Sequence, residues 1–109
     1  MKKVVVIKTE VLLFLDELVE ILVENKYFSF LKNAEKYVNN LYDAIYNDLP
    51  SLKHYDTPQQ LKRYGNYYVK IKGSKQTMWY VFFDKMDNRY LIEFITNNHA
   101  PQSEFLNEL

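Results

Sequence analysis

The chain has 109 residues, of which 48% are hydrophobic and 17% aromatic, with 14 basic and 14 acidic side chains. This length fits one domain, and this apolar content excludes an intrinsically disordered chain. The lack of cysteine excludes disulfide and thiolate chemistry. No apolar run approaches the roughly 20 residues of a membrane-spanning helix. We therefore expect one cytoplasmic domain over residues 1–109 that does not enter a membrane.

The neutral total hides an uneven distribution of charge. Residues 50–76 hold six Lys or Arg against one Asp, which gives a net charge of +5. Residues 1–49 have a net charge of −2, and residues 77–109 have a net charge of −3. A basic central segment of this kind indicates an anionic partner.

The first half of the chain predicts a strand and a first helix. Val4–Ile7 is a β-branched run of the length of a buried strand. Thr9 is the expected helix cap, and Glu10 is well placed against the helix dipole. Apolar residues then recur at spacings of three and four, at Val11, Leu15, Leu18 and Leu22. Asp16, Glu17, Glu20 and Glu24 fall on the other side, which predicts an amphipathic helix with an acidic outer face.

A second amphipathic helix is expected after a short break. Ser29 is its candidate cap, and Pro50 is expected to end it. Its apolar stripe comprises Leu31, Ala34, Val38, Leu41, Ile45 and Leu49. Two such helices joined by a short link should form an antiparallel hairpin.

The second half of the chain predicts one helical turn and three strands. Thr57, Pro58 and Gln60 resemble a cap, a first helical position and a capping-box partner. From Tyr67 to Lys72 the apolar period changes to two, which predicts a half-buried strand. Residues 78–83 predict a central strand covered on both faces, and residues 90–95 a third strand. Turns at Gly73-Ser74 and Asp87-Asn88 would join the three strands into an antiparallel meander.

These elements predict an α+β fold with an N-terminal strand, a two-helix antiparallel hairpin and a three-stranded antiparallel meander. A short helix over residues 101–109 would follow, with Phe105, Leu106 and Leu109 on one side. Phe105 and Leu106 are candidates to bind a partner, although docking on their own sheet is the simpler interpretation.

Basic and aromatic residues suggest where an anionic partner would bind. Phosphates take cationic side chains and bases stack on rings, so RNA is one candidate ligand. The candidate residues are Lys62, Arg63, Tyr68, Lys70 and Lys72. The simpler interpretation is that these lysines keep the outer strand face solvated. His99, after the last strand, could act as a general acid or base, or could be a solvent-facing turn residue.

The sequence predicts no metal site and no cofactor. His54 and His99 lie far apart in the chain and have none of the spacings of a metal site. Gly65 and Gly73 are the only glycines, so no glycine-rich phosphate loop is present.

Three segments carry a resemblance to a known family. Residues 61–69 read Leu-Lys-Arg-Tyr-Gly-Asn-Tyr-Tyr-Val, residues 79–83 read Trp-Tyr-Val-Phe-Phe, and residues 91–96 read Leu-Ile-Glu-Phe-Ile-Thr before His99. With the order strand–helix–helix–three strands, they resemble the RelE/ParE superfamily of bacterial toxins, including its HigB-like branch. The resemblance spans most of the chain and implies a type II toxin-antitoxin system.

The resemblance implies that the chain either cuts mRNA on the ribosome or inhibits DNA gyrase, and that an antitoxin protein neutralises it. In the nuclease branch, Arg63, Lys70 and Lys72 would bind phosphate, and His99 would transfer a proton. Tyr68 replaces the arginine usual in the family, and residues 78–83 contain no arginine. These differences favour a toxin that binds its target without cutting it. An endoribonuclease toxin and a non-catalytic interaction domain of mobile-element origin are the alternatives.

Overall fold

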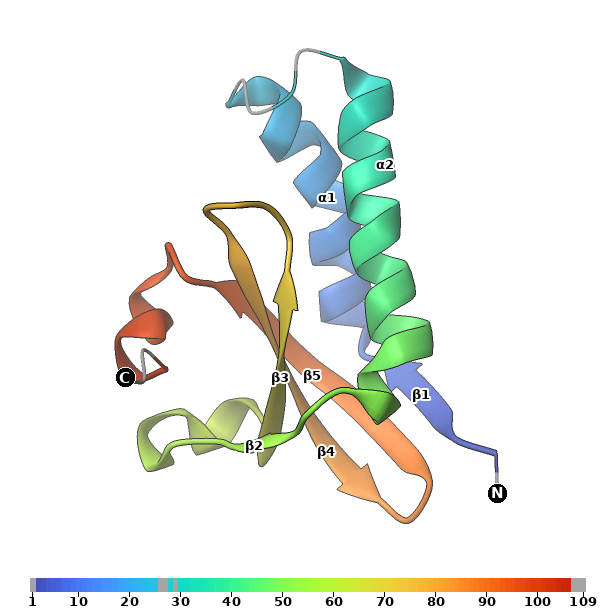
Figure 1. Ribbon diagram of the computed structural model, residues 1–109, viewed down its shortest axis with the longest axis vertical. Helices are drawn as coiled ribbons and strands as arrows, with labels where there is room; N and C mark the ends of the chain where they lie inside the picture. The colour runs from blue at the N-terminus through green and yellow to red at the C-terminus, as the bar shows by residue number, and fades with distance from the viewer. Residues whose placement is uncertain (1, 26–27, 29, 107–109) are drawn as a thin grey trace.

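The computed structural model describes residues 2–25, 28 and 30–106 (Figure 1). The strands are β1 (Val4–Ile7), β2 (Tyr55–Asp56), β3 (Tyr67–Lys72), β4 (Met78–Met86) and β5 (Arg89–Asn97). The two long helices are α1 (Thr9–Glu24) and α2 (Leu31–Asp43). Shorter helical segments are the π-helical η1 (Ala44–Asp48) and the 3-10 helices η2 (Leu49–Ser51), η3 (Gln59–Tyr64) and η4 (Pro101–Phe105).

The strands form one sheet in the order β1-β5-β4-β3-β2. β3, β4 and β5 are the predicted antiparallel meander, and β4 is its central strand. β1 joins the edge of the sheet by pairing in parallel with β5, with Val4 opposite Arg89. The burial predicted for this strand is wrong, because an edge strand is covered less and Val4 and Val6 are exposed. The short strand β2 closes the other edge by pairing with β3. The predicted α+β fold is therefore confirmed, and β2 is an addition to it.

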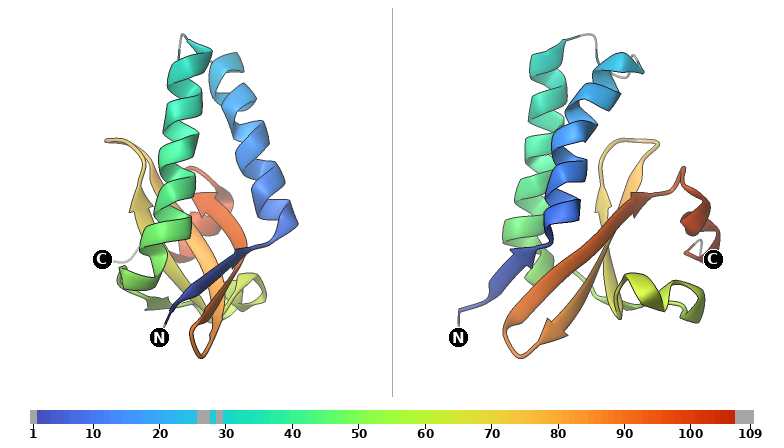
Figure 2. Two further views of the ribbon diagram at one scale, coloured as in Figure 1. Left: turned by 90° about the vertical axis from the view of Figure 1, so that its right-hand side faces the viewer. Right: turned by 180° about the vertical axis from the view of Figure 1, so that it is seen from behind.

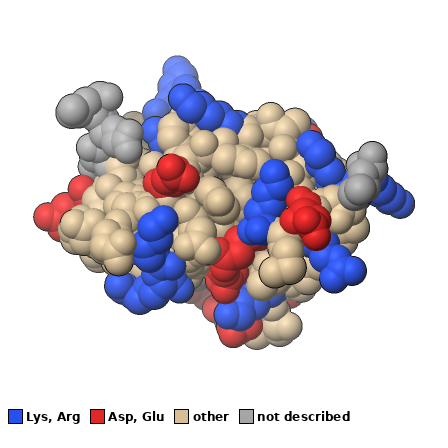
Figure 3. Space-filling view, turned by 90° about the horizontal axis from the view of Figure 1, so that it is seen from below, with Lys and Arg blue, Asp and Glu red and all other residues tan. Residues whose placement is uncertain are grey.

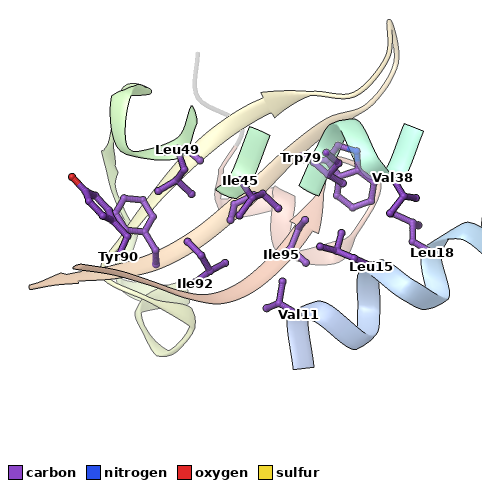
Figure 4. Packing of buried hydrophobic residues seen from close by; sticks show 14 of the residues in the cluster. Val11, Leu15, Leu18, Val38, Ile45, Leu49, Trp79, Tyr90, Ile92 and Ile95 are labelled. Atoms are coloured by element: carbon purple, nitrogen blue, oxygen red, sulfur yellow. The ribbon is translucent and has the colours of Figure 1, made fainter. Parts of the chain in front are cut away.

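The helix hairpin covers one face of the sheet (Figures 1 and 2). The apolar stripes of both helices meet the inward side chains of β3, β4 and β5 there. The close-up in Figure 4 shows this packing against Trp79 of β4 and Ile92 and Ile95 of β5. Burying these side chains is the main stabilising contribution, at about 25 cal/mol per Å² of apolar surface. The most enclosed residues of this first core are Ala34, Ile45, Leu49, Val69, Val81, Phe83 and Ile92.

The opposite face of the sheet is covered by η3 and η4, which contact each other, and η4 also contacts β5. They enclose a second, smaller core of Leu61, Tyr68, Tyr80, Phe82 and Leu106. β4 is thus buried on both faces, as its unbroken aromatic run predicts. The chain after β5 accordingly serves to cover the sheet.

Several predicted details at the helix ends are wrong. Lys8 caps α1 and Thr9 is its first helical residue, because β1 leads directly into the helix with Lys8 in an extended conformation. Pro58 caps η3, and the hydroxyl of Thr57 is buried without a hydrogen-bond partner. The backbone N–H of Thr57 instead donates to the carbonyl of Asn66, which continues the β2–β3 pairing. The predicted cap Ser29 lies outside the described residues.

The second helix also differs from its prediction at both ends. Leu31 is 55% exposed and does not belong to the buried stripe, which begins at Ala34. Pro50 does not end the helical path, because the chain passes through a π-helical turn and then a 3-10 turn that contains the proline. A proline fits the first positions of a helical turn, where its missing N–H would have no partner.

The tail forms the short helix η4 rather than a helix over 101–109, whose last three residues lie outside the described residues. Phe105 and Leu106 point to different sides, since Phe105 is 43% exposed and Leu106 is 1% exposed.

Among the described residues, no helix has the length and apolar character needed to cross a membrane.

Candidate functional site

Two lysines flank the ring of Tyr55 at the β2 edge of the sheet. The Nζ atoms of Lys53 and Lys70 lie 5.0 and 4.8 Å from the ring centroid. The same ring stacks on Tyr68, its partner across the β2–β3 pairing, at 5.2 Å and 22°. Ring stacking fixes Tyr55, and the negative face of its ring attracts both ammonium groups. We call Lys53, Tyr55 and Lys70 the cationic cluster.

The structure changes the role predicted for Tyr68. Tyr68 does share a strand face with Lys70, but it is only 1% exposed because η3 and η4 cover that part of the sheet. Its ring therefore cannot stack on an incoming base. Tyr55, which the sequence did not single out, is the partly exposed ring beside the lysines. Lys53 was likewise missed, although it belongs to the basic segment 50–76.

The other predicted cations are more scattered. Lys62 is exposed on η3, and Lys72 is exposed at the end of β3. Seen from below, Lys and Arg side chains alternate with Asp, Glu and uncharged groups, so this face carries no continuous cationic patch (Figure 3). Among the described cations of the basic segment, Lys53 and Lys70 are the two that gather at the same ring.

Arg63 is held by its own helix. Its guanidinium donates hydrogen bonds to the carbonyl of Gln60 at 2.9 Å and to the hydroxyl of Tyr64 at 3.2 Å. Tyr64 in turn stacks on Phe94 at 4.1 Å. Hydrogen bonding from Gln102, and then from Arg63, lowers the pKa of Tyr64 below its ordinary value of 10.0. Tyr64 and Gln102 are therefore members of a polar group that the sequence did not reveal.

Removing either donor should raise the pKa of Tyr64. We expect Gln102→Ala to raise it more than Arg63→Ala, because the bond from Gln102 is the larger cause of the lowering. Phenolate absorbance followed during a pH titration measures this change. The lowered pKa also means that the phenolate stabilises the fold: this contribution is present above pH 10 and is lost as the pH falls through the folded-state pKa. For the pKa measurement, Lys62→Ala is the control. An equal rise in the pKa of Tyr64 in that variant would contradict the role given to Gln102 and Arg63.

His99 lies at a different place, beside a cleft of about 470 Å³. Its Nε2 is hydrogen-bonded to the hydroxyl of Thr77 at 3.2 Å, and its backbone N–H donates to the side chain of Asn97 at 2.9 Å. The cleft is bounded by the C-terminal half of α1, the β3–β4 hairpin and the end of β5. We call it the α1 cleft.

The floor of the α1 cleft consists of aromatic side chains that are held together by a hydrogen bond and by ring contacts. Trp79 donates a hydrogen bond from its indole nitrogen to the hydroxyl of Tyr37 at 2.9 Å. Phe14 packs edge-on against the ring of Trp79, and Phe28 packs at a tilt against the ring of Tyr37. The absence of a side chain at Gly73 allows the Trp79–Tyr37 hydrogen bond, because a Cβ at this position would clash with the Tyr37 hydroxyl. Leu18, Ile21 and Leu22 of α1 make the opposite wall apolar.

The predicted catalytic pair is not brought together. Arg63 bonds to Gln60 and Tyr64, whereas His99 bonds to Thr77 and Asn97. Within the described part of the chain, no hydrogen bond or ion pair joins His99 to a lysine or arginine. In the same residues, no three His, Asp or Glu side chains lie close enough together to hold a metal ion. Among the described residues, the lysines of the cationic cluster can bind an anionic surface, and neither they nor Arg63 share a hydrogen bond with the imidazole of His99.

Comparisons with protein-family models, with curated proteins and with solved structures find no match to this chain.

Proposed function

We propose that this chain is the toxin component of a type II toxin-antitoxin system, acts in the cytoplasm and inhibits growth by binding a target. The observation that carries the proposal is the separation of the cationic cluster from His99. A nuclease needs its proton-transfer group within hydrogen-bond reach of the attacking or the leaving oxygen at the phosphate that it cleaves. The cations of this chain surround Tyr55, and His99 is engaged in the α1 cleft.

The proposed target presents a negatively charged surface. Lys53 and Lys70 lie near one ring, so two positive charges are concentrated at this edge of the sheet, where they can meet phosphate groups or clustered carboxylates. The ribosome with its mRNA and DNA gyrase are the targets that the resemblance to RelE/ParE toxins suggests. The same resemblance suggests an antitoxin protein as the neutralising partner. The order strand–helix–helix–three strands, which is part of that resemblance, occurs in the fold with β2 inserted before the last three strands.

Induction of the chain alone in a bacterial host tests the proposal. We expect growth arrest while cellular mRNA stays intact. Lys53→Ala combined with Lys70→Ala should relieve the arrest, because it removes both charges of the cationic cluster. His99→Ala should leave the arrest unchanged. The matched control is Lys32→Ala combined with Lys36→Ala, which removes two lysines from α2 and should also leave it unchanged.

Other results would favour the alternatives. Cleaved mRNA that becomes intact in the His99→Ala variant would establish an endoribonuclease. Normal growth with the unaltered chain at full expression would refute the toxin proposal and favour an interaction domain of mobile-element origin. Arrest that survives loss of both cluster lysines would show that the target binds elsewhere.

A further inference from the structure

The α1 cleft is a concave apolar site with polar groups at its mouth. Leu18, Ile21, Leu22 and Phe28 form its walls above the Trp79–Tyr37 floor, and Thr77, Asn97 and His99 lie at its edge. Such a composition is typical of sites that bury an apolar group and orient it with a few hydrogen bonds. Both α1 and the β3–β4 hairpin line the cleft, and the right-hand view of Figure 2 shows these two elements next to each other.

One wall of the cleft continues into the outer face of α1. Ile21 lines the cleft and is also 38% exposed, so it belongs to both surfaces. Successive residues of an α-helix are turned by about 100°, which places Leu13 and Glu17 on the same outer face as Ile21. Leu13 is exposed as well. The outer face of α1 beside the cleft therefore carries two exposed apolar side chains, Leu13 and Ile21, with Glu17 between them.

The charges on this helix are all of one sign. α1 contains five acidic residues and no Lys or Arg. Three of the acids, Glu10, Glu17 and Glu24, repeat every seven residues and so form a row along this same outer face. Each is exposed. A row with this spacing matches basic side chains that repeat every seven residues on a second helix.

We propose that the α1 cleft is a docking site for a cationic amphipathic helix of a partner protein. The partner helix inserts an apolar side chain into the cleft against Ile21 and Trp79, and its Lys or Arg side chains lie against the glutamate row. Charge complementarity selects the partner, and the apolar contact supplies most of the affinity.

A second copy of this chain does not fit the site as well. α1 is acidic, so two copies of it would repel each other. α2 carries Lys32 and Lys36 but also Glu35 and Asp43, so it is not a cationic helix. The inference does not rest on the proposed toxin function, because the cleft and the cationic cluster consist of different residues. The two are tested by separate measurements.

A designed peptide provides the probe. It has about four helical turns, with leucines on one face, lysines flanking them and no tryptophan. Trp79 is the only tryptophan of the protein, so its fluorescence reports on the cleft directly. We expect a saturable change in Trp79 emission that weakens as salt is added, since exposed charge pairs are screened.

Charge reversal on the protein separates the proposed site from general attraction. Glu17→Lys combined with Glu24→Lys should weaken binding of the peptide by about tenfold or more. The control variant, Glu35→Lys combined with Asp43→Lys, makes the same change in net charge on α2 and should bind as the unaltered protein does. A peptide with glutamate in place of its lysines should bind the Glu17→Lys, Glu24→Lys variant better than the unaltered protein.

Each contrary outcome overturns the proposal. The cationic peptide could fail to bind the unaltered protein, or the peptide with glutamates could bind that protein equally well. Either result would show that charge complementarity does not select the partner. Equal binding by a peptide with serine in place of leucine would show that nothing enters the cleft. A dimer of the protein alone that dissociates in the Glu17→Lys, Glu24→Lys variant would assign the surface to a second copy.

Discussion

Replacing Gly65 by alanine should lower the free energy of unfolding by at least about 3 kcal/mol. Gly65 has φ 146° and ψ 155°, a conformation that residues with a Cβ rarely adopt and that costs about 1–3 kcal/mol. A Cβ here would also lie 2.9 Å from the backbone nitrogen of Phe83. Backbone atoms in the central strand cannot move aside as a flexible side chain can. Urea unfolding followed by Trp79 fluorescence measures the loss.

The course of the backbone at residue 65 explains why glycine is needed there. Gly65 ends η3 and turns the chain into β3 while passing directly over β4. Lys75→Ala, at an exposed site in the β3–β4 turn, is the control and should change stability by less than about 0.5 kcal/mol. If the Gly65→Ala variant were as stable as this control, the backbone at residue 65 would not pass so close to Phe83.

Leu106→Ala should destabilise the protein by about 3 kcal/mol, within the range of 2–5 kcal/mol for buried leucines. Leu106 is 1% exposed and completes the second core with Leu61 and Phe82. Its loss leaves a cavity under η4. Thermal or urea unfolding measures the effect, and the neighbouring Phe105→Ala is the matched control. Because Phe105 is 43% exposed, its truncation should cost about 1 kcal/mol or less.

The comparison of these two variants decides between two roles for the tail. A large loss at Leu106 alone shows that the tail docks on its own sheet. Similar small losses at both positions would show that the tail is not packed in solution, and that both side chains are free to bind a partner. The exposed ring of Phe105 keeps it a candidate for partner binding in either case.

Local patterns predicted the main elements because burial repeats with the period of each element. Val11, Leu15, Leu18 and Leu22 are all buried, as their spacing on α1 requires. The continuous apolar run of β4 likewise indicated a strand covered on both faces, and its central place confirms this. In both cases the residues that determine burial lie within a few positions of one another.

The sequence patterns could not predict contacts between segments that are distant in the chain. Alternation placed Tyr68 on the same face as Lys70, but it could not show that η3 and η4 would cover only the tyrosine. The cationic cluster depends on β2, whose two residues carry no readable period. The α1 cleft depends on the packing of α1 against the β3–β4 hairpin, which no local motif specifies. The site was therefore predicted only in part, through Lys70 and His99.

The pairing of β1 with β5 affects how the protein is made. β1 is synthesised early, and its partner strand is synthesised roughly 4 to 17 seconds later at about 5–20 residues per second. During translation, Val4, Val5, Val6 and Ile7 have no strand to join, although the helix hairpin next to them can already form from local contacts. Closing the sheet must wait until β5 has left the ribosome. The β-branched residues of β1 are therefore the part of this chain that most needs protection from aggregation while it is being translated.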